Sequence, residues 1–269
     1  MEFGICLQSI VPVRREPAHP SEMVTQILFG ELYRVVETNA DWIRIQLTYD
    51  QYEGWISRLQ ARLIDESEFI RLYGAETAVS ADLIQLVSSE TEKMVFPIPM
   101  GSSLPGLKDQ RFHVENEIFC FEGQTSDASL LEKAITPQDR LQSKNSIVQD
   151  AMLYLHAPYQ WGGRSPFGID CSGLVQMAYK YKMVKLLRDA TQQAAQGEVV
   201  SLLAEAEPAD LAFFDDPEGN ITHVGLLIDR HRIIHCSGQV RIDTIDHEGI
   251  YHETLQKYTH KLRLIKRII

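Results

Sequence analysis

The residue types that could perform covalent chemistry gather around Cys171, in the stretch PYQWGGRSPFGIDCSGLVQMAYKY. Cys171 follows a loop rich in glycine and begins a run with helical spacing, with Asp170 placed to cap the helix. A cysteine at a helix N-terminus lies at the positive end of the helix dipole, which favours the thiolate. The backbone N–H groups there can also hold an oxyanion. Because Asp-Cys-Ser-Gly is too polar for a core segment, we interpret Cys171 as a nucleophile and not as a buried structural cysteine.

A nucleophilic cysteine needs a base, and two histidines are placed to supply it. His223 opens the run HVGLLID, and His235 lies in the next run, RIIHCSG. A three-residue loop centred on Asp229 would make these runs a hairpin with the two histidines directly opposite each other on one face. One histidine would then contact Cys171 and the other would orient the first. We expect the remaining histidines of this region at the solvated surface: His231, His247, His252 and His260.

The elements around these residues predict an α+β domain over 138–269. The run SIVQDAMLYLH at 146–156 has helical spacing and should end before Pro158, and a second helix should begin at Cys171. Strand-like runs follow at 209–216, 223–230, 232–238 and 261–268. Helices that precede a run of strands are typical of this fold class.

The first half of the chain is rich in β-type segments. Five of them, broken by turn residues, predict a small barrel over 1–66: 5–14, 23–30, 32–39, 42–49 and 53–59. Three more predict a second, diverged barrel-like domain over 75–137: 81–89, 92–101 and 111–123. A β-rich linker subdomain is the alternative for this second region.

Composition excludes several function classes. The chain has 269 residues, 26 basic and 37 acidic, with a formal net charge of −11, so it has no electrostatic footprint for nucleic acid or an anionic membrane. Its four cysteines form no CxxC pair, so we expect no metal site, no disulfide framework and no cofactor. No segment has the length of a membrane span or the pattern of a signal peptide. We therefore expect a cytoplasmic protein, with a periplasmic or secreted one as the alternative.

The order of these motifs resembles a known family. "YQWGG…G-DCSG" followed by "DLAFF" and "HVGLLI" resembles the NlpC/P60 peptidases, which have a papain-like core. "LYRVVE…DWIRIQ…YEGWIS" resembles bacterial SH3-like (SH3b) domains. The resemblance implies Cys171 as nucleophile, His223 as base and His235 as the polar residue that follows. RDATQQ also resembles a segment of the family at Arg188, Asp189 and Gln192, whereas PAD at 208–210 departs from the common P-G-D.

Proteins that combine SH3b and NlpC/P60 domains resemble γ-D-glutamyl-L-diamino acid endopeptidases. The resemblance implies a small murein peptide as substrate, L-Ala-γ-D-Glu-diamino acid with a free amine, where the diamino acid is diaminopimelate or lysine. It implies a cell-wall recycling or turnover role. It also implies the residues that read the amine: Asp170, Ser172, Tyr159 and Trp161 in the peptidase domain, and Tyr52 and Glu22 in the SH3b domain. An amidase or acyltransferase of the same fold, and a non-catalytic peptidoglycan-binding protein, are the alternatives.

Overall fold

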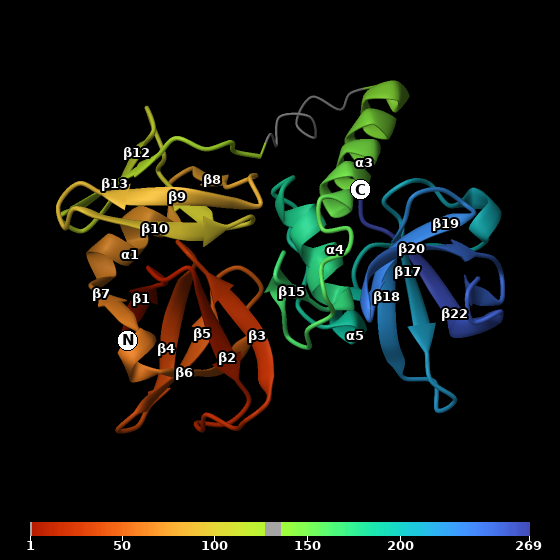
Figure 1. Ribbon diagram of the computed structural model, residues 1–269, viewed down its shortest axis with the longest axis horizontal. Helices are drawn as coiled ribbons and strands as arrows, with labels where there is room; N and C mark the ends of the chain where they lie inside the picture. Colours follow the sequence, from red (N-terminus) through yellow and green to blue (C-terminus); the bar gives the residue numbers. More distant parts are fainter. Residues whose placement is uncertain (1, 127–135) are drawn as a thin grey trace. The chain divides into compact units, whose positions relative to one another are not determined.

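The computed structural model describes residues 2–126 and 136–269. The chain divides into two compact units, residues 1–126 and 127–269 (Figure 1). Each unit has its own core, and the unit that contains Cys171 is the second one.

The first unit begins with a seven-stranded antiparallel sheet in the order β3-β2-β6-β5-β4-β1-β7. Its strands are β1 Phe3–Ile5, β2 Ile10–Arg14, β3 Met23–Leu28, β4 Leu32–Thr38, β5 Trp42–Leu47, β6 Glu53–Ser57 and β7 Arg62–Ile64, with a 3-10 turn, η1, at Arg58–Gln60. All five predicted segments contain a strand. The two short strands at the ends of the region, β1 and β7, pair with each other.

A helix that we did not predict follows this sheet. Asp65 caps helix α1, Glu66–Tyr73, by accepting a hydrogen bond from the Glu68 N–H. The next strands are β8 Thr77–Val79, β9 Ile84–Ser89, β10 Met94–Pro99, β11 Ser103–Pro105, β12 Arg111–Val114 and β13 Glu117–Phe121. Four of them form an antiparallel sheet in the order β10-β9-β13-β12, and β11 pairs with β8. The three segments predicted as strands in this region are therefore confirmed as strands.

One apolar core joins the two sheets of the first unit. It draws Phe3 and Phe29 from the first sheet, Phe69 from α1, and Phe112 and Phe119 from the second sheet. The predicted division into a domain over 1–66 and another over 75–137 stays a prediction. Residues 127–135 of that second predicted domain lie outside the described residues.

The second unit begins with helices. Helix α3, Pro137–Met152, starts with a capping box between Thr136 and Asp139, and its buried face includes Ile147, Val148 and Ala151. The helix starts earlier than the predicted 146–156 and ends earlier, because tight turns begin after Met152 and His156 adopts a positive φ of 69°. Helix α4, Cys171–Lys180, helix α5, Ala190–Gln193, and the 3-10 turn η2, Leu203–Glu205, follow.

The strands of the second unit form a closed barrel. The sheet order is β16-β22-β17-β18-β19-β20-β21, and β21 pairs back with β22, so six strands close the ring and β16 adds to its outside. The barrel strands are β17 Leu211–Asp215, β18 Ile221–Leu227, β19 Arg232–Ser237, β20 Gln239–Ile245, β21 Gly249–His252 and β22 Lys257–Arg267. The outer strand β16 is Glu198–Val200, and a small hairpin, β14 Arg164–Ser165 with β15 Gly168–Ile169, precedes α4.

Helix α4 packs against β18 and β19 and against α3. Figure 1 shows α3 and α4 side by side on one side of the barrel strands. The predicted α+β class is thus confirmed, and the packing brings the start of α4 to the strand that carries His223. No helix within the described residues is both long and apolar enough to cross a bilayer.

Candidate active site

Cys171 is the first residue of helix α4, as predicted. Asp170 caps the helix by accepting a 2.6 Å hydrogen bond from the Gly173 N–H. The backbone of Val224 and of Ser172 interacts with the Cys171 thiol and acts to lower its pKa. Since Val224 directly follows His223, this contact places the nucleophile beside the predicted base.

A buried arginine holds this end of α4 in place. Arg188 is 1% exposed and binds both carboxylate oxygens of Asp170, at 2.6 Å from Nη2 and 3.0 Å from Nη1. Its Nη1 also donates to the Ser172 hydroxyl at 2.9 Å, and that hydroxyl donates to Asp170 at 3.1 Å. The carboxylate of Asp170 is therefore an anchor between the helix and Arg188. Its further role in reading a substrate amine, and that of Ser172, stay predictions.

The predicted RDATQQ segment contributes a second anchor. Gln193, fully buried, donates to the backbone carbonyls of Ser172 at 3.0 Å and Leu187 at 2.8 Å. Gln192, at the position that the motif indicated, accepts instead from the Asp189 N–H and caps helix α5. Arg188 and Gln193 of this segment thus contact the start of α4.

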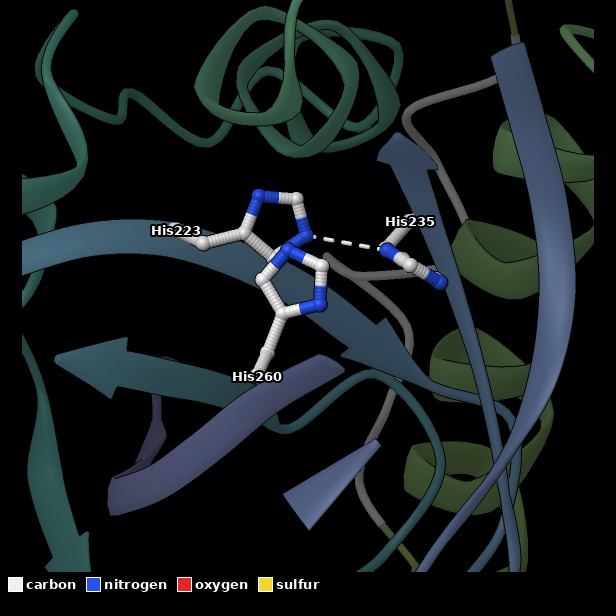
Figure 2. Close-up of side chains that lie close together, drawn as sticks. All are labelled: His223, His235 and His260. Atoms are coloured by element: carbon white, nitrogen blue, oxygen red, sulfur yellow. Dashed lines mark hydrogen bonds between the residues drawn. The ribbon is translucent and has the colours of Figure 1, made fainter. Parts of the chain in front are cut away.

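Two histidines and an aspartate form a hydrogen-bonded relay. His223 Nε2 lies 2.9 Å from His235 Nδ1 (Figure 2). On the other side of its ring, His235 Nε2 lies 2.9 Å from an Asp243 carboxylate oxygen. A carboxylate only accepts, so His235 donates from Nε2 and accepts at Nδ1, and His223 donates from Nε2. This tautomer leaves His223 Nδ1, on the side of the ring away from His235, without a proton. His223 can therefore accept the thiol proton.

The predicted register of the two histidines is wrong by two residues. His235 pairs with Gly225, and the turn extends to Arg232, whose carbonyl accepts from the Ile228 N–H. Asp229 causes the longer turn, because its carboxylate accepts from the N–H groups of His231 and Arg232. A shift of two keeps both side chains on one face, so the histidines still meet diagonally.

A glycine opposite His235 makes this diagonal contact possible. A Cβ at Gly225 would lie 2.9 Å from the Cβ of His235 and 2.6 Å from the Ile233 side chain. The missing side chain leaves room for the His235 ring to lean toward His223. Glycine at this position in HVGLL is therefore required sterically, since any side chain there would displace His235.

Asp243 and Arg241 complete the relay, and we did not predict either. Arg241 binds both oxygens of the Asp243 carboxylate, at 2.7 Å and 2.8 Å. Burial raises the pKa of Asp243, but hydrogen bonds from His235 and Arg241 outweigh burial and lower it to about 2. Asp243 is therefore ionised at neutral pH. The alternating, β-branched run QVRIDTI after Gly238 was the available signal for β20, the strand that carries both residues.

His260 also joins this cluster, and its predicted surface position is wrong. Its ring stacks on that of His223, with centroids 4.1 Å apart and an angle of 26° between the planes. His260 is half-buried on β22, and its Nδ1 lies 2.9 Å from the Thr259 hydroxyl. The order of the strands brings the two rings together, because β22 pairs with β17 and β17 pairs with β18.

The environment of Cys171 and of His223 disfavours the charged form of each side chain. Burial, followed by the negative charge of Asp170, raises the pKa of the Cys171 thiol to about 12. Burial and the neighbouring His260 and His235 hold the pKa of His223 well below its usual value. The expected stabilisation of the thiolate by the helix N-terminus is therefore outweighed by desolvation. Both shifts favour the neutral thiol and the neutral imidazole over the thiolate–imidazolium pair.

The other predicted site residues fall into two groups. Tyr159 lies close enough to the nucleophile that, after burial, the charges of Cys171 and Asp170 raise the pKa of its hydroxyl. Trp161 is 59% exposed. In the first unit, Tyr52 packs against the core of the first sheet and Glu22 pairs with Arg15 at 2.6 Å. Contact of these four residues with a substrate stays a prediction.

Residues 156–260 match the model of the NlpC/P60 family, and residues 13–60 match that of the bacterial dipeptidyl-peptidase Sh3 domain. The chain is 26% identical to dipeptidyl-peptidase 6 of Lysinibacillus sphaericus, over 91% of this chain and 92% of that protein. It is 27% identical to a γ-D-glutamyl-L-lysine dipeptidyl-peptidase of Bacillus subtilis, over 87% of this chain and 74% of that protein.

A solved structure shares the fold. The crystal structure of an NlpC/P60 family protein from Bacillus cereus aligns with a TM-score of 0.79 and 19% identity, covering 100% of this chain and 99% of that one. With the cysteine at the start of α4 and the histidine relay on the barrel, these matches show that the chain combines a bacterial SH3 domain with an NlpC/P60 domain that follows it in the sequence.

Proposed function

We propose that the protein is a cysteine peptidase that cleaves the bond between γ-D-glutamate and a diamino acid in murein peptides with a free N-terminal L-alanine. The observation that carries this proposal is the relay from His223 through His235 to Asp243, set beside a cysteine that begins helix α4. The relatives named dipeptidyl-peptidases supply the substrate class.

The first half of the reaction is acylation of Cys171. His223 Nδ1 takes the thiol proton as sulfur attacks the γ-glutamyl carbonyl, and the N–H groups at the start of α4 stabilise the oxyanion. His235, held by Asp243, orients His223 and stabilises the imidazolium that forms. The imidazolium then gives its proton to the amine of the departing diamino acid.

The second half is hydrolysis of the thioester. His223, neutral again, takes a proton from water as the water attacks the acyl-enzyme, and the thiol is restored when L-Ala-γ-D-Glu leaves. Each step moves one proton through the same ring nitrogen. The chemistry therefore requires the tautomer that the relay enforces.

The free amine gives the proposal its specificity. An ammonium group is bound by carboxylates and hydroxyls in a partly desolvated pocket, and all the predicted partners except Trp161 are of these types. In intact wall the L-alanine nitrogen is acylated by the sugar. A requirement for the amine would thus restrict the enzyme to released peptides, in keeping with recycling or turnover.

The test uses two peptides that differ only at the N-terminus: L-Ala-γ-D-Glu-meso-diaminopimelate and its N-acetylated form. We expect release of diaminopimelate from the first and little from the second, measured by mass spectrometry. Equal rates would contradict the amine requirement.

Cys171→Ala protein is the control for the mechanism. It should bind the free-amine peptide and release no product. Cleavage by this variant at the parent rate would overturn the role of Cys171. Cleavage at the L-Ala–D-Glu bond would leave the nucleophile in place but contradict the proposed bond.

A further inference from the structure

Three histidine nitrogens converge from three strands of the barrel. Figure 2 shows His223 on β18, His235 on β19 and His260 on β22 turned toward one another. One ring nitrogen from each lies within 4.8 Å of the other two. The proposed peptidase mechanism uses the first two rings and leaves the third without a chemical role.

The outer contacts of these rings resemble those around metal-bound histidines. A ligating histidine commonly donates its second ring N–H to a carboxylate or another oxygen, which fixes the ring and its tautomer. His235 has this arrangement, with Nδ1 facing the cluster and Nε2 on Asp243 at 2.9 Å. His260 has it too, with Nδ1 on the Thr259 hydroxyl at 2.9 Å. Two of the three rings are therefore already fixed with the other nitrogen available.

The spacing is within reach of tetrahedral coordination. Bonds of 2.0–2.1 Å from zinc to nitrogen separate neighbouring ligand atoms by about 3.3 Å. The 2.9 Å between His223 Nε2 and His235 Nδ1 must widen slightly, and His260 must tilt from its stack on His223. His260 is half-buried, whereas the other two are buried, so an ion and its water ligand would enter from the side of His260.

We propose that His223, His235 and His260 form an inhibitory site for a divalent transition-metal ion of the zinc type. Neutral imidazoles suit such ions, and three of them leave one position for water. This inference rests on the proposed peptidase function for its consequence, but not for the binding itself.

Metal binding and catalysis require different positions for one proton, that of the His223 ring. In the relay, the proton of His223 lies on Nε2 and is donated to His235 Nδ1. A metal ion bound by both of these nitrogens takes the place of that proton, which moves to Nδ1 of His223. Nδ1 then can no longer accept the proton of Cys171. The ion therefore inhibits without contacting the thiol, and its removal restores the catalytic tautomer.

The binding test removes the thiol as a competing ligand. Zinc is titrated calorimetrically into full-length Cys171→Ala protein and into the same protein with His260→Phe, which retains a ring on His223 but has no nitrogen. We expect one ion per chain in the first and an affinity lower by at least about tenfold in the second, since loss of even an outer-shell partner costs that much. His231→Phe, at an exposed histidine of the β18–β19 turn, is the matched control and should bind as the parent does.

The activity test uses protein with Cys171 intact. Zinc should abolish peptide cleavage at concentrations that match the binding midpoint, and a chelator should restore it. The rate of the His260→Phe variant at each zinc concentration is compared with its own zinc-free rate. Half-inhibition of this variant should require at least about tenfold more zinc than half-inhibition of the parent. Inhibition of both proteins at the same zinc concentration would place the ion on the thiol and overturn the proposal.

The two proposals fail separately. If no murein peptide is cleaved but zinc binds and His260→Phe weakens it, the metal site stands and the proposed activity falls. If the peptide is cleaved but zinc neither binds to the Cys171→Ala protein nor inhibits the parent, the metal site falls and the activity stands.

Discussion

At the residue scale, the site depends on which nitrogen of each histidine carries a proton. Asp243, ionised and held by Arg241, sets the tautomer of His235, and His235 sets that of His223. The sequence predicts the nucleophile, the base and the orienting histidine from residue types and order. It does not predict Asp243 or His260, because both reach the site through strand pairing far along the chain.

Replacement of Asp243 tests this relay. In Asp243→Asn, the amide can turn its NH2 toward His235 and reverse the proton order, so we expect kcat to fall at least about tenfold, with KM little changed. The upper bound is the roughly 10⁴-fold loss found when the acid of a serine-protease triad is made an amide. Steady-state kinetics on the free-amine peptide measures both constants.

The exposed Glu253→Gln is the matched control and should behave as the parent. A purely structural role for Asp243 would lower the amount of folded enzyme and leave kcat per folded molecule unchanged. That result, with thermal unfolding used to count folded protein, would remove Asp243 from the relay.

At the scale of elements, helix α4 and strands β18, β19 and β22 were predicted, whereas β20, which carries Asp243, was not. The sequence predicts the start of the helix because the signals lie in one short motif. Asp170 is the cap, Cys171 is the proposed nucleophile, and Gly173 allows the close approach of the backbone. The register between β18 and β19 could not be predicted from the sequence, because the Asp229 side chain lengthens the turn. Closure of the barrel could not be predicted either, since no local sequence pattern indicates that β21 pairs with β22.

Arg188 tests how α4 is anchored. Arg188→Met leaves the Asp170 carboxylate buried without its partner, so we expect the free energy of unfolding to fall by about 3–5 kcal/mol. Urea denaturation followed by circular dichroism measures it. Adding Asp170→Asn removes the orphaned charge and should recover part of the loss. A double variant that is less stable than Arg188→Met by the full cost of Asp170→Asn alone would show that the two residues are not coupled.

At the scale of the whole molecule, charge is the property that composition alone fixes. The net charge of −11 gives the protein a repulsive field for anionic peptides. The sequence also predicts a strand-rich SH3-like region followed by an α+β domain, and this order is confirmed. It leaves open how the β regions before residue 126 share a core, because that depends on contacts between Phe29 and rings such as Phe112.

Ionic strength tests the charge effect. L-Ala-γ-D-Glu-diaminopimelate carries one more negative charge than its lysine counterpart, because diaminopimelate has a second carboxylate. Added salt should therefore raise kcat/KM for the diaminopimelate peptide and affect the lysine peptide less. The increase should be less than about tenfold, the smallest rate effect typical of electrostatic steering. Equal salt responses would show that the overall field does not act on the substrate.

The closed ring of strands has a consequence for how activity is lost. His223, His235, Asp243 and His260 lie on four different members of one hydrogen-bonded circuit, so none of them belongs to a strand that can peel away alone. A barrel that has lost one of these strands no longer holds all four side chains together. Under gradual denaturation, the ability to turn over substrate should disappear together with the barrel, as one event.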